Sequence, residues 1–223
     1  MSTRQKIIIW GTGQISDVVS YFIKRDNAFD IVAYCIDREW IKETVHNDLP
    51  VIPFEDIQQH YPASEVKLLF PISFRKLNKI RETKYRAAKA MGYDFVSYIS
   101  RNAVCDASDI GENVIIFDGS IINPFVKIGN NCLIWSQTHI GHHSTIGDNC
   151  FLASARTAGC VNIENNCFIG VGSIICDTLT VGNHSIVGGG VVVTKDLPPA
   201  SVLASPRNQP LPVTSYEIEG VLA

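Results

Sequence analysis

The hydrophobic positions of the chain follow two different periodic patterns, and the pattern changes near residue 97. Before that point, short apolar runs typical of buried strands alternate with amphipathic segments typical of helices. We expect strands at 6–10, 31–37, 66–72 and 94–99, and helices at 14–25, 55–61 and 73–93. A strand, a glycine loop, a helix and a second strand that ends in the acid Asp37 together predict a Rossmann-like α/β unit.

In the second pattern, an aliphatic residue stands at every sixth position. It runs through Val104, Ile110, Ile116, Ile122, Ile128, Ile134, Ile140, Ile146 and Leu152, and resumes at Ile163, Ile169, Ile175, Val181, Val187 and Val193. Glycine often follows the aliphatic residue, and "IGEN" at 110, "IGNN" at 128 and "IGDN" at 146 repeat every 18 residues. This is the hexapeptide repeat of a left-handed parallel β-helix, in which three hexads make one coil. About five coils fit between residues 104 and 193.

The two patterns together predict an α/β Rossmann-like N-terminal domain followed by a left-handed parallel β-helix. We expect the first domain over residues 1–97, the β-helix over 98–200, and a C-terminal tail or cap over 201–223. Cys132, Cys150 and Cys167 occupy the same hexad position in successive coils, which predicts a stacked column of small buried side chains.

Composition narrows the functional classes. A net charge of −3 and the lack of a basic run argue against nucleic acid as a partner. No apolar stretch is long enough to cross a membrane, and the N-terminus does not resemble a signal peptide, so we expect a cytoplasmic protein. The seven cysteines then read as reduced thiols.

Three of the six histidines fall within residues 139–143. His142 and His143 lie two and three positions after the inward-facing Ile140, so both should face outward. His139 ends the preceding hexad, and we expect it to pack or to form hydrogen bonds. Outward histidines in a row are compatible with metal binding, with catalysis or with a solvated turn.

The loop "GTGQIS" at 11–16 lacks the third glycine of the dinucleotide-binding fingerprint. It is either a tight turn without a ligand or a helix N-terminus whose free N–H groups bind a phosphate. Asp37 could likewise accept a hydrogen bond from a ribose or base, or cap the next helix.

Both halves of the chain resemble the NeuD-type sugar acyltransferases, which include the bacillosamine and perosamine N-acetyltransferases. The stretches that carry the resemblance are "KIIIWGTG", "YCID", "GHHSTIGD", "TAGCVNI", "FIGVGS" and "IVGGGVVVTKDLP". The resemblance implies acetyl-CoA-dependent N-acetylation of a nucleotide-linked amino sugar, such as a 4-amino-4,6-dideoxyhexose. It also implies a homotrimer that needs no metal, with each active site between neighbouring β-helices.

The resemblance assigns roles to individual residues. It makes His142 the general base and gives His143, which stands where the family has an acid, a secondary catalytic role. The residues that it places against acetyl-CoA are Ala158, Gly159, Val171, Gly189 and Arg207. Those that it places against the nucleotide sugar are Gly11, Thr12, Gly13, Gln14, Asp37 and Ser73. The chain departs from the family at "GTGQI", where a Gly-His pair is usual, and at "PISFRKLN", which lacks a Gly-x-Asn. Near "LASAR" it is one residue short, and it has "ASPRN" in place of Gly-Val-Pro-Ala.

The implied chemistry suits these residues. An amine that attacks a thioester must lose a proton, which a histidine can accept near neutral pH. The N–H of Gly159 would stabilise the oxyanion. Three alternatives remain: O-acetylation of a sugar by the same machinery, a zinc enzyme of the γ-carbonic-anhydrase type, and a trimeric nucleotide-sugar-binding module without catalysis. Zinc needs three or four converging ligands, whereas "HIGHH" lies within one coil.

Overall fold

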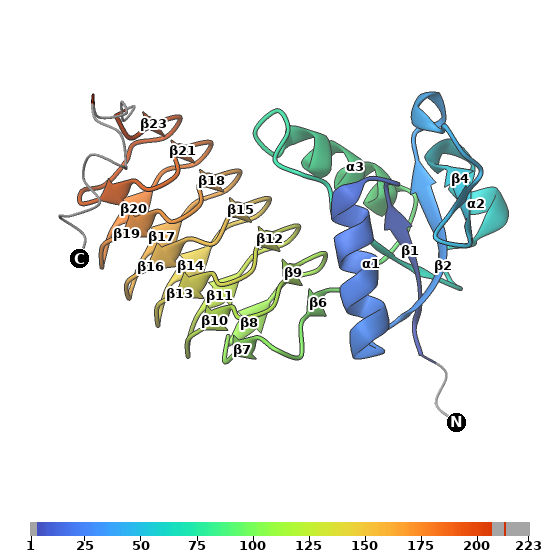
Figure 1. Ribbon diagram of the computed structural model, residues 1–223, viewed down its shortest axis with the longest axis horizontal. Coiled ribbons are helices and arrows are strands. Elements are labelled where there is room, and N and C mark those ends of the chain that lie inside the picture. Colours follow the sequence, from blue (N-terminus) through green and yellow to red (C-terminus); the bar gives the residue numbers. More distant parts are fainter. Residues whose placement is uncertain (1–3, 207–211, 213–223) are drawn as a thin grey trace.

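The computed structural model describes residues 4–206 and residue 212. An N-terminal α/β region lies beside one end of a long stack of short strands, and the stack extends away from it (Figure 1). Among the described residues, no helix is both long enough and apolar enough to cross a membrane.

The N-terminal region is built on a five-stranded sheet of order β3-β4-β2-β1-β5. Its strands are β1 (Lys6–Trp10), β2 (Asp30–Ile36), β3 (Val45–His46), β4 (Leu49–Pro53) and β5 (Lys67–Leu69). Only β3 and β4 pair antiparallel. Ile7, Ile8 and Ile9 have no exposed surface, because a central parallel strand is covered on both faces. The helices are α1 (Gln14–Asp26), α2 (Ile57–His60) and α3 (Lys79–Ala90), with 3-10 turns at Arg38–Trp40 and Phe54–Asp56.

The expected helix at 73–93 is wrong over its first six residues, since α3 begins only at Lys79. Lys76, Leu77 and Asn78 have φ values of 51°, 48° and 63°, which no right-handed helix contains. The expected strand at 94–99 is also divided. Phe95 bridges to Leu68, whereas β6 (Tyr98–Ile99) pairs with a strand of the β-helix. The β3–β4 hairpin was not expected.

The stack is a parallel β-helix with three faces. The face that packs against the α/β region, the domain face, contains β6, β9 (Ile115–Ile116), β12 (Leu133–Ile134), β15 (Phe151–Leu152), β18 (Phe168–Ile169), β21 (Ile186–Val187) and β23 (Val202–Leu203). The second, the open face, contains β7 (Val104–Cys105), β10 (Ile121–Ile122), β13 (His139–Ile140), β16 (Arg156–Thr157), β19 (Ile174–Ile175) and β22 (Val192–Val193). The third, the polar face, contains β8 (Asp109–Ile110), β11 (Lys127–Ile128), β14 (Thr145–Ile146), β17 (Asn162–Ile163) and β20 (Thr180–Val181).

The second residue of almost every strand points into the β-helix and forms its core. Ile122, Ile140 and Ile163, for example, have no exposed surface. The expected cysteine column is confirmed, because Cys132, Cys150 and Cys167 are all buried in the same core cluster.

The first residue of each strand points outward, and the three faces differ in what covers it. On the domain face, Tyr98 and Leu133 are buried against the α/β region. On the polar face these positions are Asp, Lys, Thr and Asn. On the open face, Val104 is 56% exposed and Val192 is 53% exposed. The open face is therefore largely apolar, with His139 and Arg156 at two of its outward positions, and it is uncovered in a single chain.

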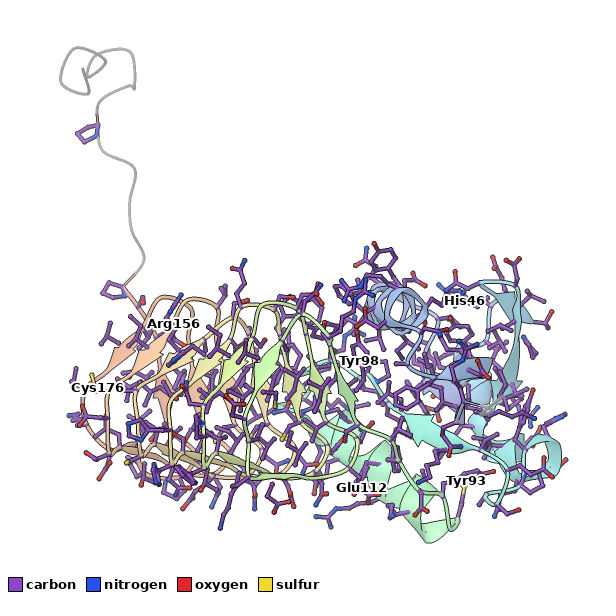
Figure 2. All side chains as sticks on the ribbon, turned by 90° about the horizontal axis from the view of Figure 1, so that it is seen from below. His46, Tyr93, Tyr98, Glu112, Arg156 and Cys176 are labelled. Carbon is purple, nitrogen blue, oxygen red and sulfur yellow. The ribbon has the colours of Figure 1, made fainter. Side chains whose placement is uncertain are left out.

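Ion pairs join α1 to the first coils. Arg25 donates to Asp118 at 2.6 Å and 2.9 Å and to Asp26 at 2.6 Å. The Tyr98 hydroxyl donates to Asp26 at 2.6 Å, and Figure 2 shows Tyr98 at the junction of the two regions. The Arg25 guanidinium holds the pKa of Asp118 well below its usual range.

Candidate active site

His142 and His143 occupy the exposed turn between β13 and β14. Their Nδ1 atoms lie 3.1 Å apart, and the ring planes are nearly perpendicular at 86°. A hydrogen bond between two Nδ1 atoms requires one nitrogen to donate and the other to accept, so the pair shares one proton there. His143 has a φ of 57°, and its ring lies 4.5 Å from that of Phe125. The ring of Phe125, in the equivalent turn of the preceding coil, therefore packs against His143 where it lies beside His142.

The Ala158–Gly159 backbone of the next coil lies directly against His142. A β-carbon on Gly159 would come within 2.6 Å of His142 Cε1. The Cys160 N–H donates to the His142 carbonyl at 2.8 Å, which fixes the two turns relative to each other. Within the described part of the chain, the Gly159 N–H donates no hydrogen bond to the backbone. A free donor and an exposed imidazole therefore lie side by side.

His139 is engaged through both ring nitrogens. Nδ1 lies 3.1 Å from the Thr157 carbonyl, and Nε2 lies 3.1 Å from Nδ2 of Asn123. The ring is half-buried on the open face, so its role is structural. Across residues 4–206, no three His, Cys, Asp or Glu side chains are grouped so as to hold a metal ion.

Val171 and Gly189 lie together, but not beside His142. The Gly190 N–H donates to the Val171 carbonyl at 2.8 Å, which stacks the two turns. Both turns follow domain-face strands and lead into the open face, whereas the turns of His142 and Gly159 lead out of it. The width of the open face thus separates the two groups within one chain. Arg207 lies outside the described residues.

A second site opens in the α/β region, as a cavity of about 740 Å³. All six residues expected to contact a nucleotide sugar line it. The lining is Trp10, Gly11, Thr12, Gly13, Gln14, Ile15, Ser16, Ile36, Asp37, Trp40, Lys42, Pro71, Ile72, Ser73, Arg75 and Ile80.

The glycine loop shapes one wall of this cavity. Gly11 has a φ of 89°, which favours glycine, and its N–H donates to the Cys35 carbonyl at 2.7 Å. The Gly13 carbonyl accepts from the Asp17 N–H at 3.0 Å and starts α1. The first-turn N–H groups of Gln14 and Ile15 have no partner within the helix, so this end of α1 favours an anion.

Asp37 lies across the cavity and forms an ion pair with Lys84 of α3. Asp37 stands at the N-terminal cap position of the turn that follows, but its side chain makes no capping hydrogen bond there. The Lys84 ammonium also lies 5.2 Å from the ring centroid of Trp10. No ion pair is found for Lys42 or Arg75 in the described residues, so the cavity wall has an excess of positive charge.

Sequence reasoning missed Lys42 and Arg75 as cavity residues, and Lys84 as the partner of Asp37. Lys84 lies in the charged helix α3, 47 positions from Asp37 along the chain, so no local pattern pairs the two residues. Arg75 was assigned to that same helix, although it lies in the turn before it.

Models of the bacterial transferase hexapeptide match residues 107–142 and 126–154, and a hexapeptide repeat of succinyl-transferase matches 160–195. The β-helix is a hexapeptide-repeat domain. Curated relatives match it locally: bifunctional GlmU of Anaplasma marginale is 44% identical over 41 residues, and galactoside O-acetyltransferase of Escherichia coli is 43% identical over 44 residues. These segments cover 18% and 20% of this chain, and 10% and 22% of those proteins.

Solved structures extend the likeness to both regions. The acetyltransferase domain of PglB from Neisseria gonorrhoeae has a TM-score of 0.80 at 19% identity and covers 93% of this chain and 100% of its own. PerB from Caulobacter crescentus, solved with CoA and GDP-perosamine, has a TM-score of 0.79 at 25% identity and covers 90% and 94%. WeeI from Acinetobacter baumannii scores 0.77 at 23% identity and covers 90% and 97%. The expected fold, a Rossmann-like region followed by a left-handed β-helix, is confirmed, and with it the resemblance to sugar acetyltransferases of the NeuD type.

Proposed function

We propose that this protein is an acetyl-CoA-dependent N-acetyltransferase whose acceptor is a nucleotide-linked amino sugar. The observation that carries the proposal is the exposed His142 ring lying against the bare Gly159 backbone. The likeness to PerB, which was solved with CoA and GDP-perosamine, extends over 90% of this chain and supports it.

In the proposed reaction, the amine nitrogen of the sugar bonds to the thioester carbonyl carbon. Nε2 of His142 takes the proton that the amine loses, and the Gly159 N–H stabilises the oxyanion. The carbon–sulfur bond then breaks, and the CoA thiolate leaves and receives the proton. For Nε2 to accept, Nδ1 of His142 must carry the hydrogen and donate it to Nδ1 of His143. His143 thus orients His142 as a neutral acceptor.

The cavity of the α/β region would hold the nucleotide half of the acceptor. The N-terminus of α1 offers free N–H groups to a diphosphate, and Lys42 and Arg75 add positive charge on the same wall. Asp37 keeps acceptor capacity beyond its bond to Lys84, which suits a ribose hydroxyl or a base N–H.

We further propose that a homotrimer completes the site. The turns of Val171 and Gly189 and those of His142 and Gly159 lie at opposite edges of the open face, so a second copy could bring unlike edges together. The open face also exposes Ile121, at 43%, and Ile174, at 42%, as a closing interface requires. Arg156 lies on this face as well, on the β-helix away from the α/β region (Figure 2). All seven cysteines are free, which supports a reducing compartment such as the cytoplasm.

The test is a screen of UDP-, dTDP- and GDP-linked 3- and 4-amino sugars with acetyl-CoA, followed as free thiol. With one class of acceptor, acetyl-CoA should release free thiol and the product should be an amide that is stable to hydroxylamine. A product that hydroxylamine cleaves would instead indicate O-acetylation. Thiol release from none of them would contradict the proposal. Sedimentation should show a trimer that Ile121→Asp disrupts, and a stable, active monomer would contradict a shared site.

A further inference from the structure

Arg81 of α3 is the largest fully buried side chain of the described residues, with 1% of its surface exposed. Its Nε donates to the Asn131 carbonyl at 3.0 Å. Nη1 donates to the Ile72 and Ser73 carbonyls at 2.9 Å and 3.3 Å, and Nη2 to those of Asn149 and Cys150 at 2.9 Å and 3.0 Å. A guanidinium has five N–H donors, and here each meets a backbone carbonyl.

No carboxylate balances this charge within the described part of the chain, since none of the ion pairs found there includes Arg81. Burial lowers the pKa of Arg81 to about 10, which leaves it charged at neutral pH. Replacing buried ionic groups by apolar side chains of similar size is often neutral or stabilising. Stability alone therefore gives a weak reason for burying an arginine at position 81. Its five carbonyl partners point instead to a role in holding separate segments in a fixed geometry.

Four of the five carbonyls belong to two parts of the proposed machinery, and the fifth, of Asn131, lies in the preceding coil of the β-helix. Ile72 and Ser73 form the wall of the nucleotide cavity. Asn149 and Cys150 lie in the coil that carries His142, just before β15. One side chain therefore bonds directly to the cavity wall and to the coil of the proposed base.

The turn after this wall is also held by the β-helix. The ring of Phe74 lies 5.2 Å from Phe151 and 4.7 Å from Phe168. Nδ2 of Asn78 donates to the Cys167 carbonyl at 3.0 Å. Three successive left-handed residues, 76–78, cost energy and persist only where the surroundings impose them. The cavity wall thus takes its position from the β-helix.

We infer that Arg81 is a positioning residue that fixes the nucleotide cavity relative to the β-helix, so that in the proposed trimer a tethered amino group reaches a His142 ring in one register. The inference rests on the proposed function for what the tether is. Displacement of a reacting group by about 1 Å is enough to cost ~100-fold in rate. An acceptor that does not occupy the cavity should not depend on this register.

The test compares Arg81→Met and Arg81→Lys, with Arg86→Met as a control on the exposed side of α3. We expect Arg81→Met to lower kcat/KM for the nucleotide-linked amino sugar by ~10- to 100-fold. The acetyl-CoA KM should stay within about twofold of the wild-type value. The slow turnover of the same amino sugar without its nucleotide should also stay within about twofold, a smaller change than the loss of a typical hydrogen bond causes. Arg81→Lys should be intermediate, because an ammonium has three donors for five carbonyls. Equal losses for tethered and free acceptors would overturn the inference.

Hydrogen exchange tests the same contact without activity. In Arg81→Lys, the amides of 72–78 should exchange faster, whereas the core amides of β17–β20 keep their protection. Unchanged exchange at 72–78 would overturn the inference. If wild-type protein acetylated no nucleotide-linked amino sugar, the proposed function would fail, while this comparison would still decide whether Arg81 holds the cavity wall.

Discussion

Gly159 approaches His142 so closely that a β-carbon at position 159 would lie 2.6 Å from Cε1 and 2.7 Å from Nε2 of the ring. The two residues belong to successive coils, which the Cys160 N–H bond to the His142 carbonyl holds together. The backbones of the two turns are thus held at a constant separation by the β-helix itself. Any side chain at position 159 would displace the His142 ring, which makes Gly159 a sensitive position for testing the site.

Gly159→Ala should lower kcat by ~100-fold or more, because the ring of His142 must leave its position and general-base catalysis is worth about that much. The melting temperature should change little, since the ring can rotate into solvent. Cys160→Ser is the control, as it alters an exposed side chain one position away and should retain near wild-type kcat. Steady-state kinetics and thermal melts check both variants. Equal activity of the two would place the chemistry elsewhere.

His142→Asn keeps polarity and approximate size but removes basicity. We expect kcat to fall by ~100-fold or more, with the oligomer and the affinity for acetyl-CoA intact. His139→Asn should act mainly through stability, because both of its ring nitrogens are engaged. Kinetics combined with calorimetry separates the two. A His142→Asn variant that still turns over at the normal rate would reject His142 as the base.

His143→Asn should cost about 10-fold in kcat, since a neighbour of the base assists it rather than accepting the substrate's proton. His143→Asp would place a carboxylate beside Nδ1 of His142 and stabilise the imidazolium. The acidic limb of the pH profile of kcat/KM should then move to higher pH, because His142 would stay protonated further up the scale. An unmoved acidic limb in His143→Asp, or an inactive His143→Asn beside an active His142→Asn, would show that the roles are misassigned.

Asp37→Asn should raise the KM of the nucleotide-linked acceptor by about 10-fold, in line with the loss of a hydrogen bond to a charged group. The acetyl-CoA KM should be unchanged, because Asp37 lies in the cavity of the α/β region. Lys84→Met tests the partner: it removes the ion pair but leaves the carboxylate, so its effect should be smaller. Isothermal titration with the matching nucleoside diphosphate checks binding alone. A parallel loss for both substrates would make Asp37 purely structural.

Asp118→Asn should lower the melting temperature at pH 7, and its difference from wild type should shrink as the pH falls below about 4. The folded pKa of Asp118 is depressed by Arg25, so its contribution is present above the unfolded value of about 3.9 and disappears as pH falls toward the folded one. The difference in melting temperature between wild type and variant should therefore narrow steadily as the pH falls from about 4 toward the depressed pKa of the folded state. Melting curves across this range measure it, with Asp109→Asn on the polar face as the control. A gap that stays constant with pH would rule out the ion pair as its source.

The β-helix could be predicted from the sequence because its code is local and repeated. Each inward position must be apolar and each turn must be tight, so Ile122, Ile140 and their equivalents recur at a period that no other architecture shares. The outward placement of His142 and His143 follows from the same period. The Rossmann-like half was predicted for a similar reason, since Ile7, Ile8 and Ile9 read as a strand buried on both faces.

What the sequence determined by itself was therefore the coils of the β-helix, the first two strands and the first helix of the α/β region, the direction in which side chains alternate, and the position of the histidine turn. Only the tertiary structure decided that residues 73–78 leave the helix, because the bonds that hold this turn come from Phe151, Phe168 and Cys167. The pairing of Asp37 with Lys84 and the grip of Arg81 on two separate regions likewise depend on packing between distant segments. Periodicity records which way a residue faces along its own strand or helix. It does not specify which residue lies opposite. That is set by packing within the α/β region, as for Asp37 and Lys84, and by the way this region docks on the domain face.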